Sequence, residues 1–258
     1  MIKTYIHYST LAFLLTCSAL VGCSSLHITV PSSFKTNAIV IPVEVNRKAS
    51  FLGNKEGKVQ INIGGIKTRL LTAKESSEAV RVNLSGVLNV SLTSSDEVEQ
   101  YSFQIDQKDK PSVIVHCIIG REKTGEELHL SANSSVGNEK VLKTSMRCEA
   151  QSNNKAIGQI SIDRGYKEKT LNRSFTYQEE TYQISSIHTV QNWNMKRRSP
   201  YGYRISRDSD LLTAIQVNLP FRLLTKPSLS EVDLEATLFF FLSVIYYDEL
   251  FSSTFGVF

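Results

Sequence analysis

The sequence has little of several residue types, and each shortage excludes a class of protein. Only four cysteines and six prolines occur among 258 residues, which excludes a cysteine-dense disulfide scaffold and a proline-rich or collagen-like chain. CxxC, HxH, HExxH and GxSxG patterns are all missing, so no redox, metal or hydrolase motif is visible. We therefore expect no metal and no cofactor.

The excess of one sign of charge over the other is also small. The formal net charge is +4, with 41% hydrophobic and 21% charged residues. This composition is typical of a globular protein, and the mild charge does not predict binding to nucleic acid. Apolar runs are short: those at 11–22 and 236–247 fall below the roughly 20 residues of a membrane-spanning helix.

The N-terminal segment has the layout of an export signal. Lys3 precedes the apolar run, which ends in Leu20-Val21-Gly22-Cys23. This ending resembles the lipobox of bacterial lipoproteins, and the resemblance implies cleavage after a signal peptide of residues 1–22 and acylation of Cys23. The alternative is an ordinary secretory peptide with an incidental cysteine.

The lipobox resemblance also implies a location. Ser24, where an aspartate would favour inner-membrane retention, points to the outer membrane, with the protein facing the periplasm. Residues 23–36 have few regular signals and are expected to form a tether. Residues 37–258 are expected to form the β-rich domain, with a possible subdivision near 150–165.

Two cysteines remain in this domain, Cys117 and Cys148, each within a strand-like run. In an oxidising periplasm such a pair predicts a disulfide. Two buried thiols, or one reactive thiol, are the alternatives.

Short β-type runs separated by polar turns fill residues 37–218. Gly64-Gly65 and Ser85-Gly86 are typical of two-residue hairpin turns, and Pro42 predicts an edge position or a bulge. No convincing helix signal occurs before residue 228, and no repeat of fixed period is present.

The C-terminal part has a different pattern. Ser228 and Glu231 form a Ser-x-x-Glu capping box, and the uncharged run 236–247 is apolar on every helical face. We therefore predict a helix over about 229–251, buried inside protein. A buried strand is the alternative for this run.

Many antiparallel strands followed by one wholly apolar helix resemble the tubby-like fold of tubby domains, phospholipid scramblases and LURP-one-related proteins. The resemblance rests on the following segments: Phe175–Tyr177, Tyr182–Ile184, Tyr203–Ile205, Leu211–Ile215 and Leu234–Leu250. It implies an antiparallel β-barrel of about twelve strands around a hydrophobic C-terminal helix. The alternative architecture is a β-sandwich followed by a small α+β domain.

One loop combines aromatic and cationic residues. It contains Trp193, Lys196, Arg197, Arg198 and Tyr201. Such a combination can bind an anionic lipid headgroup or an acidic protein partner, although it is also compatible with an ordinary solvated hairpin loop.

These observations favour a membrane-anchored, non-enzymatic lipoprotein that acts as a binding or envelope-structural module. Its expected partners are the membrane, through the N-terminal lipid, and an envelope protein or anionic lipid. Two alternatives stay open: a periplasmic hydrolase whose active site forms no motif, and an accessory of an outer-membrane assembly. The oligomeric state does not follow from the sequence.

Overall fold

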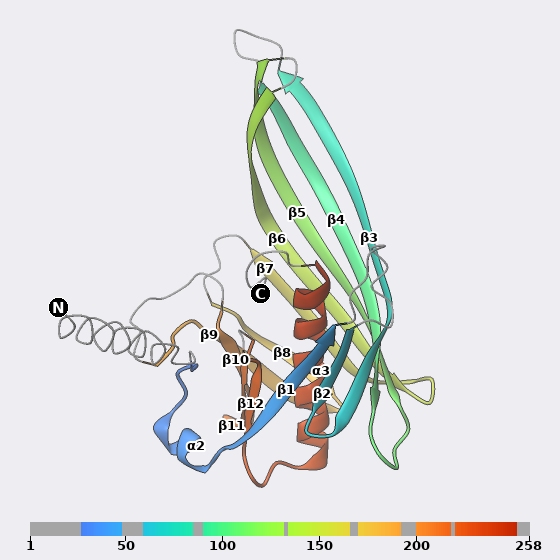
Figure 1. The fold of residues 1–258 in the computed structure, drawn as a ribbon, viewed down its shortest axis with the longest axis vertical. Coiled ribbons are helices and arrows are strands. Elements are labelled where there is room, and N and C mark those ends of the chain that lie inside the picture. Colours follow the sequence, from blue (N-terminus) through green and yellow to red (C-terminus); the bar gives the residue numbers. More distant parts are fainter. Residues whose placement is uncertain are drawn as a thin grey trace, which may run out of the picture.

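The computed structural model describes residues 27–47, 59–84, 90–131, 134–165, 170–191, 200–217 and 220–251. Within these ranges, twelve antiparallel strands close into one barrel around a C-terminal helix (Figure 1). The mainly β fold predicted from the sequence is thereby confirmed, and the sandwich alternative is wrong.

The chain follows a simple meander around the barrel. Each strand pairs with the next in sequence, and β1 closes the barrel by pairing with β12. The strands are β1 (Ile39–Arg47), β2 (Val59–Ile63), β3 (Ile66–Leu84), β4 (Val90–Asp106), β5 (Val113–Ser131), β6 (Ser134–Ser152), β7 (Lys155–Gly165), β8 (Asn172–Tyr177), β9 (Glu180–Ile187), β10 (Gly202–Arg207), β11 (Asp210–Gln216) and β12 (Arg222–Thr225).

The helix α3 (Glu231–Phe251) fills the barrel interior. It begins later than the capping box suggested: the hydroxyl of Ser230, not Ser228, accepts the backbone N–H of Asp233 at 3.2 Å. Asp233 accepts the Ser230 hydroxyl in return at 2.6 Å. The cap therefore has the expected chemistry, shifted by two residues.

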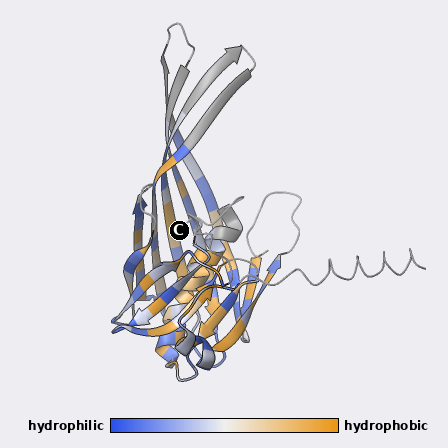
Figure 2. Cartoon of the chain, turned by 90° about the vertical axis from the view of Figure 1, so that its left-hand side faces the viewer, coloured by the Kyte–Doolittle hydropathy of each residue, from blue (hydrophilic) through white to orange (hydrophobic). Residues whose placement is uncertain are grey.

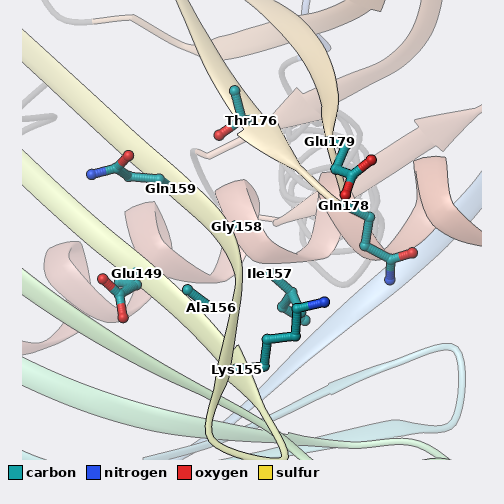
Figure 3. Close-up of a pocket in the computed structure, with 9 residues that line it drawn as sticks. All are labelled: Glu149, Lys155, Ala156, Ile157, Gly158, Gln159, Thr176, Gln178 and Glu179. Atoms are coloured by element: carbon teal, nitrogen blue, oxygen red, sulfur yellow. The ribbon is translucent and has the colours of Figure 1, made fainter.

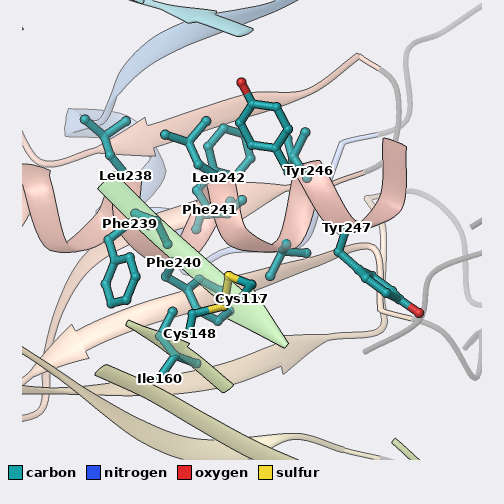
Figure 4. Close-up of a cluster of buried hydrophobic side chains, with 14 of the residues drawn as sticks. Cys117, Cys148, Ile160, Leu238, Phe239, Phe240, Phe241, Leu242, Tyr246 and Tyr247 are labelled. Carbon is teal, nitrogen blue, oxygen red and sulfur yellow. A yellow bond between two sulfur atoms is a disulfide. The ribbon is translucent and has the colours of Figure 1, made fainter. Parts of the chain in front are cut away.

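Apolar side chains surround α3 on all sides. Phe239, Phe240 and Phe241 are fully buried, and Figure 4 shows them with neighbouring core residues of the helix and the barrel wall. Phe240 stacks on Phe175 of β8 at 5.8 Å and meets Tyr203 of β10 edge-on at 5.4 Å. A helix with no polar face is stable because the barrel covers every side of it.

Cys117 and Cys148 form a disulfide, as predicted. They occupy directly opposed positions on β5 and β6, and both side chains are buried in the core. The bridge lies beside α3 (Figure 4). It therefore links two neighbouring strands of the barrel covalently, next to the helix.

Pro42 lies where β1 changes its partner strand, and Gly64-Gly65 lies where the chain turns from β2 to β3. Pro42 is the last β1 residue paired with β12, and from Val43 onward β1 pairs with β2. At Pro42 the strand therefore has a partner on one side only, which is the predicted edge position and tolerates the missing N–H. Gly64 and Gly65 form the β2–β3 turn with φ of 56° and 91°, as expected for a hairpin.

Four strands are much longer than the sequence suggested. Separate short strands were expected on either side of residues 72–79, but β3 and β4 pair without a break from Lys67–Asp106 to Leu84–Val90, apart from one register shift. The polar stretch had suggested a turn; it is instead strand outside the barrel, where both faces meet water. The Ser85-Gly86 turn lies outside the described residues.

The long halves of β3–β6 project from the barrel as a four-stranded sheet, which we call the arm (Figure 1). Hydrophobic residues concentrate in the barrel and around α3, below the base of the arm (Figure 2). The ladder β3–β4–β5–β6 is continuous from the barrel to the distal end of the arm.

The segment before β1 is packed rather than extended. Ile28 forms a β-bridge with Val190, and a short helix α2 (Ser32–Asn37) follows. Ile28, Val30 and Phe34 are buried in a small outer cluster against the barrel wall. The expectation of a tether up to residue 36, and of no helix before 228, is therefore wrong from Ile28 onward, because this segment carries three apolar side chains that cover the wall.

Candidate functional site

The base of the arm is marked by a change in the inward-facing side chains. On β4, Phe103 and Tyr101 face the core and Glu99 comes next in the same alternation; on β5, Ile119 is followed by Arg121. Side chains of one strand face the same side at every second position. Along each strand, the inward-facing side chains therefore change from apolar to charged where the strand leaves the barrel.

Arg121 is the centre of this charged row. Its Nη2 donates to both carboxylate oxygens of Glu99, at 2.7 and 2.8 Å, and its Nε donates to the Tyr247 hydroxyl of α3 at 2.7 Å. Its Nη1 lies 3.5 Å from Glu97, which also pairs with Lys123. Two cations thus meet two anions at the end of the barrel.

Burial decides the electrostatics of this group, which we call the base cluster (Glu97, Glu99, Arg121, Lys123 and Tyr247). Glu99 is only 2% exposed. Burial raises its pKa, and the Arg121 guanidinium opposes that rise. Burial likewise raises the pKa of the Tyr247 hydroxyl well above its usual range, so it stays protonated. The charges pair with one another, and the hydrogen bond from Arg121 to Tyr247 joins the base of the arm to the helix.

The other end of α3 is held by a second set of polar contacts. Lys110 pairs with Glu235 at 2.6 Å and Arg207 with Asp233 at 2.7 Å, while the buried Tyr182 hydroxyl donates to Asp233 at 3.0 Å. Helix and barrel are therefore tied at both ends, which makes the body a stiff support for the arm.

A cleft of about 730 Å³ lies on the barrel wall at β6–β8 (Figure 3). β7 and β8 pair only over the short stretch from Gly158 to Ile160, and the cleft lies at this stretch. Its lining residues are Glu149, Lys155, Ala156, Ile157, Gly158, Gln159, Thr176, Gln178 and Glu179. Charges of both signs line it, from Glu149, Lys155 and Glu179.

The residues singled out from the sequence are only partly described. Cys23, Trp193, Lys196, Arg197 and Arg198 lie outside the described residues, and the predictions for them stay predictions.

Tyr201 does not fit the surface role expected for it. It is 1% exposed and packs with Ile28 and Phe34 in the outer cluster. The prediction that Tyr201 is an exposed binding residue is therefore wrong, because the N-terminal segment covers it.

The base cluster was missed by the sequence analysis, although a signal for it exists. Glu97-x-Glu99 and Arg121-x-Lys123 continue the period of two set by Tyr101-x-Phe103 and by Cys117-x-Ile119. Charged residues of opposite sign at the inward positions of adjacent strands predict cross-strand pairs. The register between β4 and β5, which decides which residues meet, is not visible in the sequence.

In the described part of the chain, no group of three or more His, Cys, Asp or Glu residues could hold a metal ion. Among the same residues, no helix is both long and apolar enough to cross a membrane. Comparisons with protein-family models, with curated proteins and with solved structures found no match to this chain.

Proposed function

We propose that this chain is a lipid-anchored, non-enzymatic protein of the bacterial cell envelope, in which the filled barrel is a rigid support and the arm is the binding element. The observation that supports this most strongly is the arm: four paired strands that continue well past the body they belong to. A sheet extended in this way can reach another molecule while its base stays fixed.

The filled barrel supports the role of a rigid body. Side chains of α3 occupy the interior, and the largest of them are fully buried, among them Phe239, Phe240, Phe241 and Tyr246. Interiors packed in this way behave as solids and transmit force instead of deforming. The space that other barrels use for a ligand is here taken by the protein's own helix.

The reach of the arm follows from strand geometry. Beyond Ala73 and Tyr101, the last paired positions of β3 and β4 that contact the core, the hairpin continues to Leu84 and Val90. Eleven further residues along β3, at about 3.3 Å per residue, extend the sheet by about 35 Å. This distance is large enough to contact a partner well away from the barrel.

The anchor is proposed from the lipobox-like sequence Leu20-Val21-Gly22-Cys23. Two or more acyl chains hold a protein firmly to a bilayer, whereas one chain does so reversibly. The absence of an aspartate after Cys23 favours the outer membrane. A helix-filled barrel with the segments quoted above is also what a tubby-like relationship would give, and we propose that relationship for the fold alone.

The anchor is tested by replacing Cys23 with alanine in cells fed labelled palmitate. We expect the Cys23→Ala chain to lose the label and to appear in the soluble fraction. Cys17→Ala is the matched control, since Cys17 lies upstream of the proposed cleavage point; it should keep the label. Continued labelling of Cys23→Ala would contradict the proposal.

The binding role of the arm is tested by shortening it at one level of the sheet. Ser77, Glu97, Arg121 and Thr144 are opposed across the four strands. Replacing residues 78–96 and 122–143 each by an Asn-Gly turn removes the distal arm and keeps Arg121, Glu97 and Glu99.

We expect the shortened chain to fold and to be acylated, and to lose the cross-links that the intact chain forms in living cells. Circular dichroism and palmitate labelling establish that the shortened protein is folded and anchored. An unchanged set of cross-linked proteins would show that the arm is not the binding element.

A further inference from the structure

Two cationic side chains lie beside His27, the first residue that the structure describes. Nη1 of Arg222 on β12 lies 3.0 Å from Nδ1 of His27. Lys35 of α2 donates to the side-chain oxygen of Gln191 at 2.8 Å, and the backbone N–H of Gln191 donates to the carbonyl oxygen of His27, also at 2.8 Å. These contacts join β12, α2 and the N-terminal segment into one connected group.

The positive charge of this group is not balanced by acidic side chains. Within the described part of the chain, Lys35 and Arg222 bond an amide and an imidazole, and neither pairs with a carboxylate. Burial lowers the pKa of His27, and the positive charges of Arg222 and Lys35 lower it further. An anion at this place would therefore be stabilised by two cations at once.

Exposed apolar side chains adjoin these cations. Pro42 is directly opposed to Arg222 across β1 and β12, and Val40 lies two positions before Pro42 on the same strand. Opposed residues share a face of the sheet, as do alternate residues of one strand. Val40 is 53% exposed, and Pro42 is exposed as well. We give the name anchor-side patch to the following residues: His27, Lys35, Val40, Pro42 and Arg222.

The anchor-side patch lies close to the proposed anchor. Four residue steps separate Cys23 from His27, and they span at most about 14 Å. Acyl chains on Cys23 would hold it at the surface of the bilayer, so they would bring the patch to the level of the lipid headgroups. α2 and the start of β1 lie on the barrel, well away from the distal end of the arm (Figure 1).

We propose that the anchor-side patch binds the phosphate groups of anionic phospholipids in the bilayer that carries the anchor. This inference rests on the proposed acylation of Cys23 and names the surface of the body that meets the membrane. Lys35 and Arg222 pair with headgroup phosphates, while Val40 and Pro42 lie against the apolar boundary beneath them. The anchor keeps patch and lipid together at a high effective concentration, so a small number of contacts is sufficient.

The patch gives the anchored body one orientation. An acyl anchor alone leaves the barrel able to turn about its linker, whereas a second contact on the barrel wall removes that freedom. The arm lies on a different part of the molecule (Figure 1). It is therefore not covered when the patch rests on the bilayer, and every copy presents its arm at the same angle.

Contact between patch and lipid is measured with a fluorophore on Val40→Cys, since Cys117 and Cys148 are bridged. The full chain, lipidated in cells, is placed in vesicles of phosphatidylcholine, alone or mixed with phosphatidylglycerol, that contain a lipid with a quencher on its headgroup. We expect strong quenching in the mixed vesicles and weak quenching in phosphatidylcholine alone. A fluorophore on Ser161→Cys, an exposed position of β7 across the barrel from β1 and β12, should be quenched weakly in both.

Neutral replacements test the two cations. Lys35→Gln with Arg222→Gln should lower the ratio of bilayer-bound to released patch about thirtyfold, at about fivefold for each cation near an anionic surface. Lys108→Gln with Lys155→Gln removes the same charge from exposed positions elsewhere on the body and should leave the quenching unchanged. Circular dichroism establishes that both proteins are folded.

Charge reversal separates recognition of charge from damage to the fold. Lys35→Glu with Arg222→Glu should lose quenching in the anionic vesicles and regain it in vesicles that contain a cationic lipid instead. Loss in both kinds of vesicle by the folded protein would overturn the proposal. Equal quenching of the unaltered patch with and without phosphatidylglycerol would also overturn it, because the anchor alone would then hold this face to the bilayer.

The outcome also separates this inference from the proposed function. If the chain is labelled by palmitate but the fluorophore on Val40→Cys is not quenched, the patch is wrong and the anchor stands. If the chain takes up no palmitate, the anchor and this inference are both wrong.

Discussion

At the scale of single residues, the most informative group is the base cluster, because it places charge where a core would be expected. Arg121 and Glu99 compensate each other across β4 and β5. Such a pair costs desolvation energy, and hydrogen bonds to further partners offset it. Tyr247 provides one of these bonds from α3, so the cluster reports whether helix and arm are correctly joined.

We predict that Arg121→Leu and Glu99→Leu each destabilise the protein by about 3 kcal/mol, because each leaves one charge without its main partner. The double variant should lose clearly less than the sum, since it leaves no lone charge of this pair. Urea unfolding of the four proteins in a double-mutant cycle measures the difference. Arg147→Leu is a matched control: its pair with Asp163 is largely exposed, and its loss should be below about 1 kcal/mol. Additive losses at Arg121 and Glu99 would show that the two do not act as a pair.

At the scale of elements, the close approach of α3 to β7 depends on one glycine. A Cβ at Gly158 of β7 would lie 2.6 Å from Cδ2 of Tyr177 and 3.1 Å from Cε1 of Phe239. The absence of a side chain therefore lets the helix approach the wall closely.

We predict that Gly158→Ala lowers the free energy of unfolding by about 1–3 kcal/mol, because two buried rings must move. Gly165→Ala on the same strand is the control, since a Cβ there meets nothing within 4 Å. Thermal or urea unfolding compares the two. Equal stability of Gly158→Ala and Gly165→Ala would mean that the helix does not approach β7 as closely as the structure has it.

The elements that could be predicted are those whose signal is local. The apolar run 236–247 and the cysteines at 117 and 148 carry their structural consequences in their own composition. The length of β3 could not be predicted, because Lys74–Glu78 is polar at every position and has no period that indicates which face is buried. The packed position of Ile28 and Phe34 depends on an apolar patch formed by strands far away in the sequence.

Among the residues of the candidate site, the same distinction applies. The charge alternation at Glu97-x-Glu99 and Arg121-x-Lys123 is visible in the sequence, but the register that pairs Glu97 with Arg121 is a property of the closed barrel. The burial of Tyr201 likewise depends on the N-terminal segment. Long-range pairing, not local propensity, therefore determines this site.

At the scale of the whole molecule, the packed N-terminal segment would control how far the barrel stands from a membrane if the proposed anchor at Cys23 holds. Only residues 24–27 separate Cys23 from Ile28, which is bridged to Val190. Five residue steps span at most about 18 Å. If Cys23 carries lipid, the barrel must therefore lie close to the bilayer, and the outer cluster determines which part of the wall is nearest.

We predict that Ile28→Ser with Phe34→Ser releases this segment and moves the barrel away from the membrane, because up to about fifteen residues, or about 50 Å, would then separate Cys23 from the start of β1. A fluorophore on Gln183→Cys, an exposed position of β9, should transfer energy efficiently to labelled lipid headgroups in proteoliposomes of the lipidated protein, and less efficiently in the Ser variant. Thr36→Ala, exposed on α2, should leave the transfer unchanged. Equal transfer in all three proteins, with lipidation retained, would show that the packed segment does not determine the distance between barrel and bilayer.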